Sequence, residues 1–440
     1  METTFWPELI GGKFCQNFPK EINGFWNDTR TLKKGNCFLT LQAKRDGYDF
    51  LKDAQQKEAS CALVNRINRE LTLPQWEVEN VFEAAKILAK RHRKNYTLIA
   101  ITGSYGKTST KDMVKLLLGE KAYATAENLN NILGATLTLS HLCGEQFAVI
   151  ESGIDHPGEM DTLTDLLRPD ITLITGISPV HVVNFENFEQ LVKEKFKILE
   201  DTLSRQGLGI IGENCLEHRF FREVAHRCVL IGRSRQVEVF PNFTRFQISG
   251  ACEVYLYGKY FKGSVFRVPR MSLGQKEDFA MAATIVKILG LADEVIEERI
   301  RDWRPGKMRG ERVYFRGHSV YLDSYNANPL AMEDALRHFD EQYSGDNTYV
   351  LGGMRELGEF SEGYHRDLVE HFKEKEAGLV IGIGEEMEVF CKILREKHRD
   401  IEVIHFPGVS EAKGYFQQRC RGSIFIKGSH DYQLWKIIEE

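Results

Sequence analysis

The sequence contains no hydrophobic run long enough to cross a membrane. A membrane-spanning helix needs about 20 consecutive apolar residues, and no apolar stretch in these 440 residues approaches that length. The first residues, METTFWPELIGG, also lack the basic start and the apolar core of a secretory signal peptide. These absences predict a cytoplasmic protein with no segment inserted in a membrane.

Cysteine pairs and excess positive charge are also missing. The nine cysteines form no C-x-x-C pair, so we expect reduced thiols rather than a disulfide framework or a zinc site. The formal net charge of −5 gives no electrostatic reason to expect a nucleic-acid partner, which would favour a basic surface. No coiled coil or long apolar helix face is evident, and we therefore expect a monomer.

The length and the order of the predicted elements indicate an α/β protein of three domains. At about 150 residues per domain, the chain has room for two to four. Residues 1–82 contain short strands and turns, with a strand predicted at 37–41 and a helix at 50–59. We expect a small α/β N-terminal domain here, a central P-loop parallel-sheet ATPase domain over 83–303, and a C-terminal Rossmann-like domain over 304–440.

Strands alternate with helices in the second and third segments, which predicts parallel sheets covered by helices on both faces. After a helix at 81–95, the central strands are predicted at 96–101, 147–152, 171–177, 207–212 and 228–232. In the third segment, strands are predicted at 319–325, 348–354, 378–384 and 423–429, with helices at 330–342 and 362–375. In such sheets the functional residues gather beyond the carboxyl ends of the strands.

The stretch TGSYGKTST resembles a phosphate-binding loop that has lost two residues. A usual P-loop has four residues between its first glycine and its Gly-Lys pair, whereas only two separate Gly103 from Gly106. An apolar strand precedes the loop and an amphipathic helix follows it, which favours nucleotide binding over a chance Gly-Lys-Thr turn. Lys107 would then reach the β and γ phosphates, and the Thr108 hydroxyl would face Mg²⁺.

Other polar residues follow the predicted strands, and each has an ordinary structural explanation when taken alone. Glu151 ends a strand, where it would bind magnesium or simply face solvent, and a single loop histidine such as His181 is more often structural. Lysines 193, 195 and 197 would by default form a solvated helix face. Asp323 ends a strand before SYNANP, and Arg309 lies in a Gly-rich, basic linker.

Together these motifs resemble the Mur ligases, the ATP-dependent amino-acid ligases of peptidoglycan precursor synthesis, and most closely the MurF type. TGSYGKTST is similar to that family's TGSNGKTTTK, ENLNNILGATLTL to NxNNxIGxPLTL, and ESGIDHPGEM to EMGxxHPGEI. LDSYNANPLAMEDAL is similar to DDSYNANPxSMxxAL, and VLGGMRELGEFSEGYHRDL to VLGDMxELGxxSxxxHxxV. The segments NDTRTLKKGNCFLTLQAKRDGYDF and FIKGSHDYQLWKIIEE extend the resemblance to both ends of the chain.

Three departures from the family pattern concern the choice of the incoming amine. Gly353 stands where the family usually has Asp, and the run Gly-Lys-Met-Arg at 306–309 replaces a usual Gly-Arg. KGSHDYQ also resembles the KGHExYQ of the MurE type, which adds the third residue of the peptide.

The resemblance implies a reaction in which ATP converts the carboxylate of UDP-MurNAc-tripeptide to an acyl phosphate, which the amine of D-alanyl-D-alanine then attacks. One Mg²⁺ would be held by Thr108 and Glu151, and a second by His181 and a carbamylated Lys195. Lys107, His181 and Lys195 would be the catalytic residues. The implied nucleotide-binding residues are Gly103, Ser104, Tyr105, Gly106, Lys107, Thr108, Ser109, Asn131, Arg309, Asp323 and Asn326. Arg309 would reach the γ-phosphate and Asp323 the ribose when the C-terminal domain closes.

The resemblance also assigns the remaining substrate contacts. The N-terminal domain would hold the UDP end with Asp28, Thr29, Arg30 and Asp46, and the third domain would bring D-Ala-D-Ala with Asn328, Lys427 and Ser429, its carboxylate meeting the KGSH turn. Lys195 follows His181 by fourteen residues, the family's spacing for a carbamylated lysine. The helical step of about 100° turns its two lysine neighbours about 160° away from it.

Alternatives remain at this point. A MurE-like ligase would add a single amino acid to UDP-MurNAc-dipeptide. A phosphotransferase with the same loop would release a phosphorylated product, and a degenerate binding module would catalyse nothing, for which Gly353 is the only hint.

Overall fold

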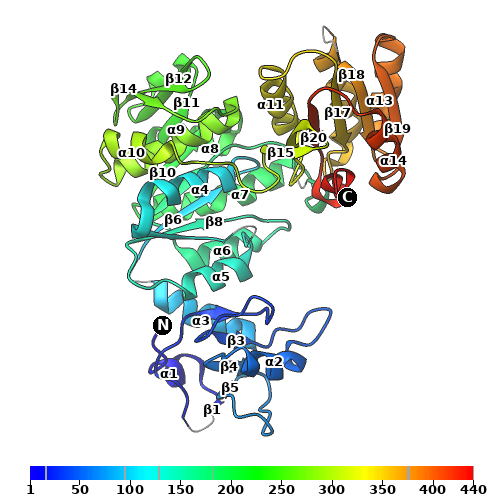
Figure 1. Ribbon diagram of the computed structural model, residues 1–440. Helices are drawn as coiled ribbons and strands as arrows, with labels where there is room; N and C mark the ends of the chain where they lie inside the picture. Colours follow the sequence, from blue (N-terminus) through cyan, green and yellow to red (C-terminus); the bar gives the residue numbers. More distant parts are fainter. Residues whose placement is uncertain (15–16, 94–95, 127–128, 181, 374–376, 440) are drawn as a thin grey trace.

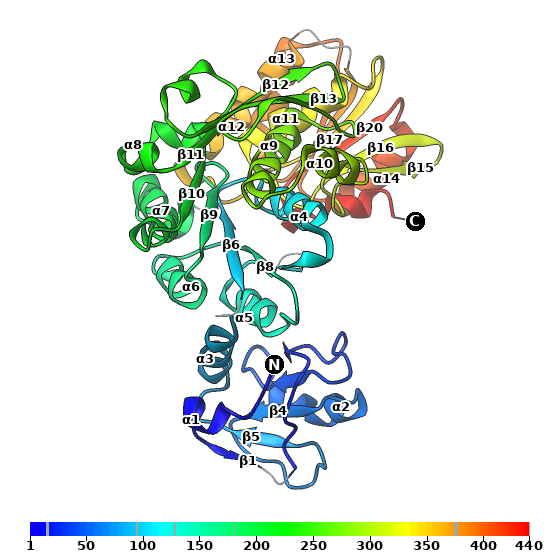
Figure 2. The ribbon, with the colours of Figure 1, turned by 90° about the vertical axis from the view of Figure 1, so that its left-hand side faces the viewer.

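Three sheets follow one another along the chain in the computed structural model (Figure 1). The structure describes residues 1–14, 17–93, 96–126, 129–180, 182–373 and 377–439. The N-terminal sheet lies at one end of the molecule, the central sheet follows it, and the C-terminal sheet lies beside the central one (Figures 1 and 2). The prediction of an α/β protein of three domains is confirmed, whereas the exact boundaries at 82 and 303 stay a prediction.

The N-terminal sheet has five strands in the order β1-β5-β4-β3-β2, parallel except for β1. Its strands are β1 (Lys13–Phe14), β2 (Phe25–Trp26), β3 (Cys37–Leu39), β4 (Cys61–Val64) and β5 (Gln75–Glu77). Helices α1 (Trp6–Ile10) and α3 (Val81–His92) cover one face, and α2 (Leu51–Gln56) the other. The helix predicted at 50–59 is therefore shorter, and a 3₁₀ turn (Gly47–Phe50) precedes it.

Helix α3 joins the N-terminal domain to the central one. The Asn80 side chain accepts the N–H groups of Phe82 and Glu83, so the helix begins where an N-cap residue predicts. One side of α3 contributes Val81, Ala84 and Leu88 to the N-terminal core. The helix also contacts α5 and α6 of the central domain (Figure 2).

The central sheet has nine strands in the order β14-β13-β12-β11-β10-β9-β6-β8-β7. They are β6 (Thr97–Thr102), β7 (Ala122–Ala124), β8 (Phe147–Glu151), β9 (Ile171–Ile174), β10 (Leu208–Gly212), β11 (Val229–Gly232), β12 (Phe243–Ser249), β13 (Glu253–Gly258) and β14 (Lys262–Arg267). Strand β6 pairs in parallel with β8 and β9, so the carboxyl ends of these three strands meet at one edge. The sequence analysis missed β12–β14, whose antiparallel pairing makes the sheet mixed rather than wholly parallel.

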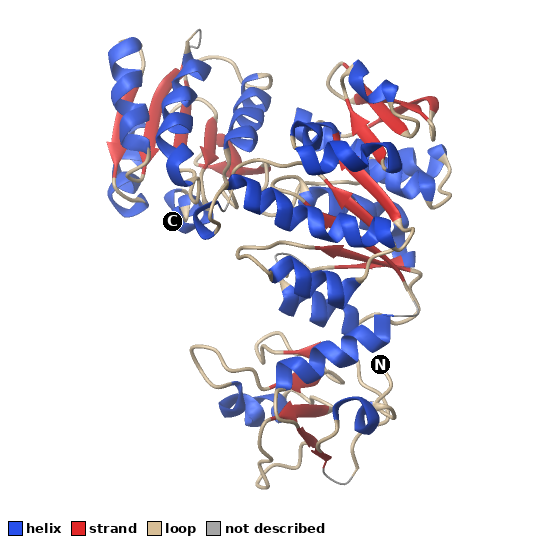
Figure 3. Ribbon diagram, turned by 180° about the vertical axis from the view of Figure 1, so that it is seen from behind, coloured by secondary structure: helices blue, strands red, loops and turns tan. Residues whose placement is uncertain are grey.

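Helices cover both faces of the central sheet (Figure 3). One face packs against α4 (Lys107–Leu118), α9 (Leu273–Ile288) and α10 (Asp293–Ile300). The other packs against α5 (Ile132–Ser140), α6 (Glu159–Leu167), α7 (Phe188–Ser204) and α8 (Arg219–Val224). The longest helix has 17 residues, and no helix in the described ranges is long and apolar enough to cross a membrane.

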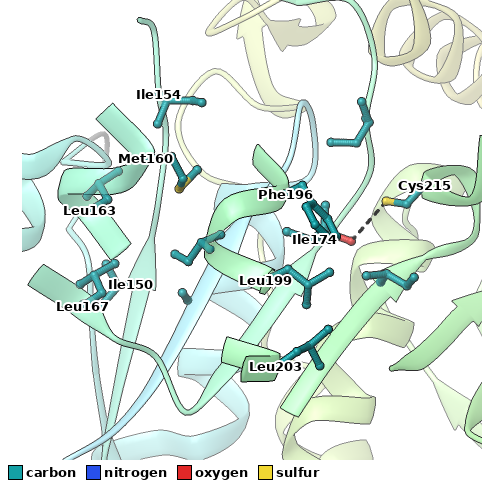
Figure 4. Close-up of a cluster of buried hydrophobic side chains, with 14 of the residues drawn as sticks. Ile150, Ile154, Met160, Leu163, Leu167, Ile174, Phe196, Leu199, Leu203 and Cys215 are labelled. Atoms are coloured by element: carbon teal, nitrogen blue, oxygen red, sulfur yellow. Dashed lines mark hydrogen bonds between the residues drawn. The ribbon is translucent and has the colours of Figure 1, made fainter. Parts of the chain in front are cut away.

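The apolar core between helices α6 and α7 and the central sheet holds the ends of strands β8 and β9 in place. Figure 4 shows apolar side chains of α6 and α7 meeting those of strands β8 and β9: Ile150, Met160, Leu163, Leu167, Ile174, Leu199 and Leu203. Each is at most 4% exposed. Because such interiors are close-packed, the strand ends on this side of the sheet form a rigid base for the site described below.

The C-terminal sheet has six strands in the order β15-β16-β20-β17-β18-β19, parallel except for β15. They are β15 (Glu311–Phe315), β16 (His318–Asp323), β17 (Asn347–Gly352), β18 (Ala377–Ile383), β19 (Glu402–Phe406) and β20 (Ile424–Lys427). Helices α11 (Pro329–Asp340), α12 (Ser361–Asp367) and α13 (Met387–Lys397) lie on one face, and α14 (Val409–Arg419) on the other. The helix predicted at 362–375 is instead α12 followed by a 3₁₀ turn (Leu368–Phe372).

Candidate active site

The loop that follows β6 depends on two glycines. Gly103 has a φ of +146° and Gly106 a φ of +74°. A Cβ atom on Gly103 would lie 2.1 Å from Thr175 Oγ1, and one on Gly106 would lie 2.3 Å from Asp278 Oδ1. Gly106 is also the N-cap of α4, so the loop leads into the free N–H groups and the positive end of that helix. This arrangement can receive a phosphate group.

The two residues between the glycines are tied to neighbouring strand ends. Ser104 Oγ donates to the carbonyl of Ser178 at 2.8 Å and accepts the N–H of the same residue at 2.9 Å. The Tyr105 hydroxyl accepts a hydrogen bond from Asn214 Nδ2 at 2.5 Å. Ser109 lies in the first turn of α4. The shortened loop is therefore held in shape by residues that follow β9 and β10.

Lys107, at the start of α4, lies over the loop. Its Nζ donates to the Gly103 carbonyl at 2.9 Å. Burial lowers the pKa of Lys107 and the positive charge of Arg309 lowers it further, while Glu151 opposes both effects. An ammonium in this position gains from a negative ligand, as a phosphate would be.

A buried carboxylate at the end of β8 provides oxygen atoms that fit a hard cation. Glu151 is 1% exposed; its Oε1 accepts hydrogen bonds from Thr108 Oγ1 at 3.1 Å and Asn130 Nδ2 at 3.2 Å. Its Oε2 is buried and has no hydrogen-bond partner among the described residues. An unpartnered buried carboxylate oxygen next to a hydroxyl suits Mg²⁺, which prefers oxygen ligands. Nowhere in the described ranges do three or more His, Cys, Asp or Glu residues gather as a metal site, so a cation here would need ligands from the substrates as well.

Lys195 lies behind the loop and is buried on α7. It is 1% exposed, and its Nζ donates to the Gly103 carbonyl at 3.2 Å. Burial and the charge of Lys107 lower the pKa of Lys195 to about 7, against a smaller opposing effect of Asp155. By contrast, Lys193 is exposed and Lys197 pairs with Asp161 at 2.7 Å, as the helical spacing requires.

The predicted histidine ligand at position 181 lies outside the described residues. Its neighbour Val182 is described, and the N–H of Val182 donates to the Glu356 carbonyl of the C-terminal domain at 3.2 Å. The loop that follows β17 therefore contacts the segment that follows β9.

A cavity of about 570 Å³ lies between the central and C-terminal domains. The central domain lines it with loop and α4 residues 104–109 and with Glu151. The C-terminal domain lines it with Arg309, Asp323, Asn326 and Asn328. The guanidinium of Arg309 stacks 3.8 Å above the ring of Tyr325. We expected the C-terminal residues to reach the nucleotide only on closure, and in this structure they already share the cavity with the loop.

From the sequence, Lys427 was expected to receive the carboxylate of an incoming dipeptide. In the structure, Lys427 does not present a free ammonium. It is 1% exposed, and its Nζ binds Asp323 Oδ2 at 2.6 Å and the Asn326 carbonyl at 3.1 Å. Ser429 does not line the cavity; its Oγ accepts the N–H of Arg355 at 2.9 Å. The ion pair forms because Asp323 and Lys427 are register partners on β16 and β20, which the sequence alone does not show.

The two asparagines directly before α5 make different contacts, and nucleotide binding by Asn131 stays a prediction. The Asn131 side chain accepts the N–H of Gly134 at 3.0 Å and caps α5. The preceding residue, Asn130, lines the cavity and binds Glu151. Asn328 likewise caps α11 through the N–H of Ala331 at 2.9 Å, but it remains part of the cavity wall.

The N-terminal candidates lie on a separate domain. Asp28 and Arg30 form an ion pair at 2.6 Å, and the hydrogen bond from Arg30 lowers the pKa of Asp28. Thr29 lies between them and is partly exposed. Asp46 accepts the N–H of Tyr48 at 3.0 Å, and Arg66 stacks 4.2 Å from the ring of that tyrosine. None of these residues lines the cavity.

Three carboxyl groups of the cavity wall were not predicted from the sequence: Asp278, which is buried, and Glu277 and Asp334, which are partly buried. Burial raises the pKa of Glu277 to about 7 and raises the pKa values of Asp278 and Asp334. Asp278 accepts a hydrogen bond from Thr110 Oγ1 at 3.2 Å. Asp334, on α11, accepts the N–H of Gly274 at 3.1 Å and so links the C-terminal domain to the start of α9. In the sequence, the adjacent Glu277 and Asp278 before a long apolar run are the signal for two of these groups, and no local pattern marks Asp334.

Comparisons with known proteins agree with this architecture. Residues 101–247 match the family described as "Mur ligase middle domain", and residues 308–430 match the family described as "Mur ligase, glutamate ligase domain". Together the two matches cover more than half of the chain. The UDP-N-acetylmuramoyl-tripeptide–D-alanyl-D-alanine ligase of Rickettsia prowazekii is 28% identical over 437 residues, covering 94% of this chain and 93% of its own. The Escherichia coli protein of that name is 29% identical over 393 residues, covering 86% and 85%.

Solved structures show the same fold. MurF from Acinetobacter baumannii superposes with a TM-score of 0.81 at 23% identity, over 99% of this chain and 97% of that one. MurF from Thermotoga maritima, solved in complex with ADP, superposes with a TM-score of 0.76 at 20% identity, over 94% and 96%. With two family profiles, full-length relatives and a shared three-domain fold, the chain belongs to the Mur ligase family.

Proposed function

We propose that this protein is an ATP-dependent ligase that joins D-alanyl-D-alanine to UDP-MurNAc-tripeptide in peptidoglycan precursor synthesis, releasing ADP and phosphate. The observation that carries the proposal is the cavity in which the shortened loop of the central domain meets Arg309 and Asp323 of the C-terminal domain. Relatives that carry this activity in their names align over nearly the whole chain, and an ADP-bound MurF shares the fold.

The residues of the cavity suit the activation of a carboxylate. A carboxylate is a poor electrophile, so ATP first transfers its γ-phosphoryl group to it, and the resulting acyl phosphate is attacked by the amine. Both reactants are anionic, and Lys107 and the start of α4 offset their repulsion. Arg309 would bind the γ-phosphate and Asp323 the ribose. Both domains line the cavity, and their further closure would keep water away from the labile acyl phosphate.

Two magnesium ions are part of this proposal. Thr108 and Glu151 would hold the first, consistent with the unpartnered Oε2 of Glu151. His181 and a carbamylated Lys195 would hold the second, because a carbamate supplies the oxygen ligands that an ammonium cannot. When bound, the ions would neutralise charge on the phosphates and the carboxylate. The low pKa of Lys195 favours the neutral amine that reacts with CO₂.

The N-terminal domain would hold the UDP end of the substrate through Asp28, Thr29, Arg30 and Asp46. Each of these residues lies in or next to a turn, where backbone and side-chain groups are accessible. We place the reaction in the cytoplasm, where ATP is available, and we expect a monomer, which sedimentation would test.

The decisive assay mixes the enzyme, ATP and UDP-MurNAc-tripeptide with a panel of amino acids and dipeptides and measures ADP and phosphate. We expect D-Ala-D-Ala to be preferred over every single amino acid. Preferential use of a diamino acid with UDP-MurNAc-dipeptide would instead indicate the MurE-type activity. A stable phosphorylated product without free phosphate would indicate a phosphotransferase, and no turnover with any pair would indicate a binding module.

A further inference from the structure

A polar cluster that the proposed mechanism leaves unused lies beyond the carboxyl ends of β17, β18 and β20. Arg355 Nη1 binds Glu386 Oε1 at 3.0 Å. The Tyr432 hydroxyl donates to the other oxygen of Glu386, and the Arg355 guanidinium stacks 4.6 Å from the Tyr432 ring. Ligands of parallel α/β sheets bind at this edge, so the cluster lies where a substrate of the C-terminal domain would be expected.

The cluster holds a guanidinium in a fixed and accessible position. The Arg355 side chain is 48% exposed, whereas that of Glu386 is 20% exposed. Glu386 contacts one end of the guanidinium and Tyr432 contacts its face, so among the described contacts the Nε and Nη2 donors remain for a further ligand. A planar guanidinium with two donors on one edge matches a carboxylate.

Glycines create the space for this arrangement. A Cβ on Gly353 would lie 2.8 Å from Glu386 Oε2 and 3.0 Å from the Tyr432 hydroxyl. A Cβ on Gly384 would lie 2.4 Å from the Tyr432 ring. Gly353 is the position where the family pattern has Asp, and in this chain the carboxylate of Glu386 lies beside that glycine.

The loop that carries Arg355 also contacts the central domain, at the segment that follows β9. The Glu356 carbonyl accepts the N–H of Val182, and at the start of the loop the N–H of Met354 donates to Nε2 of the buried His365 at 2.9 Å. The loop therefore connects the polar cluster to the segment that follows β9. Arg355 itself does not line the cavity, so a ligand held there must extend from the end of β17 to reach it.

The spacing of the strands fits a dipeptide better than a single amino acid. Asp323 ends β16, and β20 lies between β16 and β17. Two strand spacings are about 10 Å, and an extended chain covers about 3.5 Å per residue. Of this distance an extended dipeptide covers about 7 Å and a single amino acid about 3.5 Å, so the dipeptide brings its amine closer to the cavity edge.

We propose that Arg355 is the anchor for the carboxylate of the incoming acceptor, and that Glu386 and Tyr432 are positioning residues that orient its guanidinium. The proposal rests on the ligase function above and replaces the earlier expectation that Lys427 receives this carboxylate. Because the anchor recognises a carboxylate at a set distance from the amine, it selects a dipeptide with a free C-terminus.

The test compares D-Ala-D-Ala with its C-terminal amide, which keeps the amine but removes the charge. In the wild type we expect kcat/KM for the acid to exceed that for the amide by about 30- to 100-fold, the size of a charge-assisted hydrogen-bonded contact. In Arg355→Met the ratio should fall close to one through a raised KM for the acid, with the KM for ATP unchanged. Arg355→Lys should restore part of the ratio.

Further variants separate the anchor from a structural role. Glu386→Gln and Tyr432→Phe should each lower the acid-to-amide ratio severalfold while leaving the melting temperature within a few degrees. Arg366→Ala is the matched control, because Arg366 is an exposed arginine of α12 in the same domain that pairs with Glu362 of its own helix. Its acid-to-amide ratio should equal that of the wild type.

Two outcomes overturn the proposal in distinguishable ways. If the wild type ligates D-Ala-D-Ala but Arg355→Met keeps the acid-to-amide ratio, Arg355 is not the anchor and the ligase function stands. If the wild type does not ligate the dipeptide at all, the proposed function and the anchor both fail.

Discussion

Replacing Lys195 with alanine tests the second metal site most directly. Lys195 is the one lysine of its helical stretch that is fully buried, and it donates to the same Gly103 carbonyl as Lys107. If it carries a carbamate, Lys195→Ala should lose most of the activity, by 100-fold or more on the scale of a lost electrostatic contact in catalysis. Short carboxylic acids, which would supply the missing oxygens, should restore part of it.

The lowered pKa of Lys195 determines how much of its amine is neutral at a given pH. With a pKa of about 7 rather than 10.5, Lys195 is about three quarters neutral at pH ~7.5, instead of about one part in a thousand. Only the neutral amine reacts with CO₂, so the lowered pKa raises the reactive fraction of Lys195 several-hundred-fold. As pH falls below 7 the amine of Lys195 gains a proton, so the rate at which CO₂ reactivates depleted enzyme should fall about tenfold per pH unit.

The assay removes bicarbonate, measures ligation, and then restores a fixed concentration of dissolved CO₂ at several pH values. Intact-protein mass spectrometry follows the mass added by one CO₂. Lys193→Ala and Lys197→Ala are the matched controls, since one residue is exposed and the other pairs with Asp161 at 2.7 Å. An unmodified Lys195 in active, magnesium-loaded enzyme would refute the reasoning, as would a Lys195→Ala variant with normal turnover.

Three shorter predictions concern the loop and its surroundings. Lys107→Ala should reduce ADP release by at least 100-fold, because the loop at 103–109 contains no second cation to take its place on the phosphates; near-normal turnover would remove the nucleotide assignment. Gly106→Ala should weaken ATP binding at least tenfold and lower the melting temperature, because its φ of +74° costs about 1–2 kcal/mol for a side chain and its Cβ would meet Asp278 at 2.3 Å; Gly363→Ala, with open space around it, should change neither. Asp334→Ala should raise the KM for ATP severalfold while Asp334→Asn changes it less, because the amide keeps an acceptor for the N–H of α9; equal KM values for both variants would show that this link is dispensable.

The local features of the site could be predicted from the sequence because they depend on nearby residues. A strand, two glycines and a helix within 97–118 determine the loop, since only glycine tolerates φ values of +146° and +74° there. Helical geometry alone places Lys195 opposite Lys193 and Lys197, and the structure shows that Lys195 is on the buried side. Strand ends such as Glu151 gather because parallel neighbours end at one edge.

The remaining features depend on contacts between residues that are far apart in the sequence. Asp278 meets Thr110 across 168 positions, and Lys427 meets Asp323 across 104. No local pattern reports these pairs, so the carboxyl groups were missed and Lys427 was expected to be free. The strands β12–β14 were missed for another reason: they form an antiparallel extension at the edge of the sheet with many partly exposed residues, which weakens the hydrophobic signal of a buried strand.

The shared Gly103 carbonyl suggests why the two lysines of the site should act together. Both Lys107 and Lys195 donate to it, and the positive charge of Lys107 helps to lower the pKa of Lys195. Two ammonium groups so close repel each other, and negative charge at either position relieves that repulsion. A carbamate at Lys195 would supply such charge and favour the ammonium of Lys107, which would bind the phosphates. Phosphates at Lys107 would instead favour the ammonium of Lys195 and so oppose its carbamylation, and we therefore expect carbamylation to precede ATP binding. The Gly103 carbonyl is the point at which the two lysines meet.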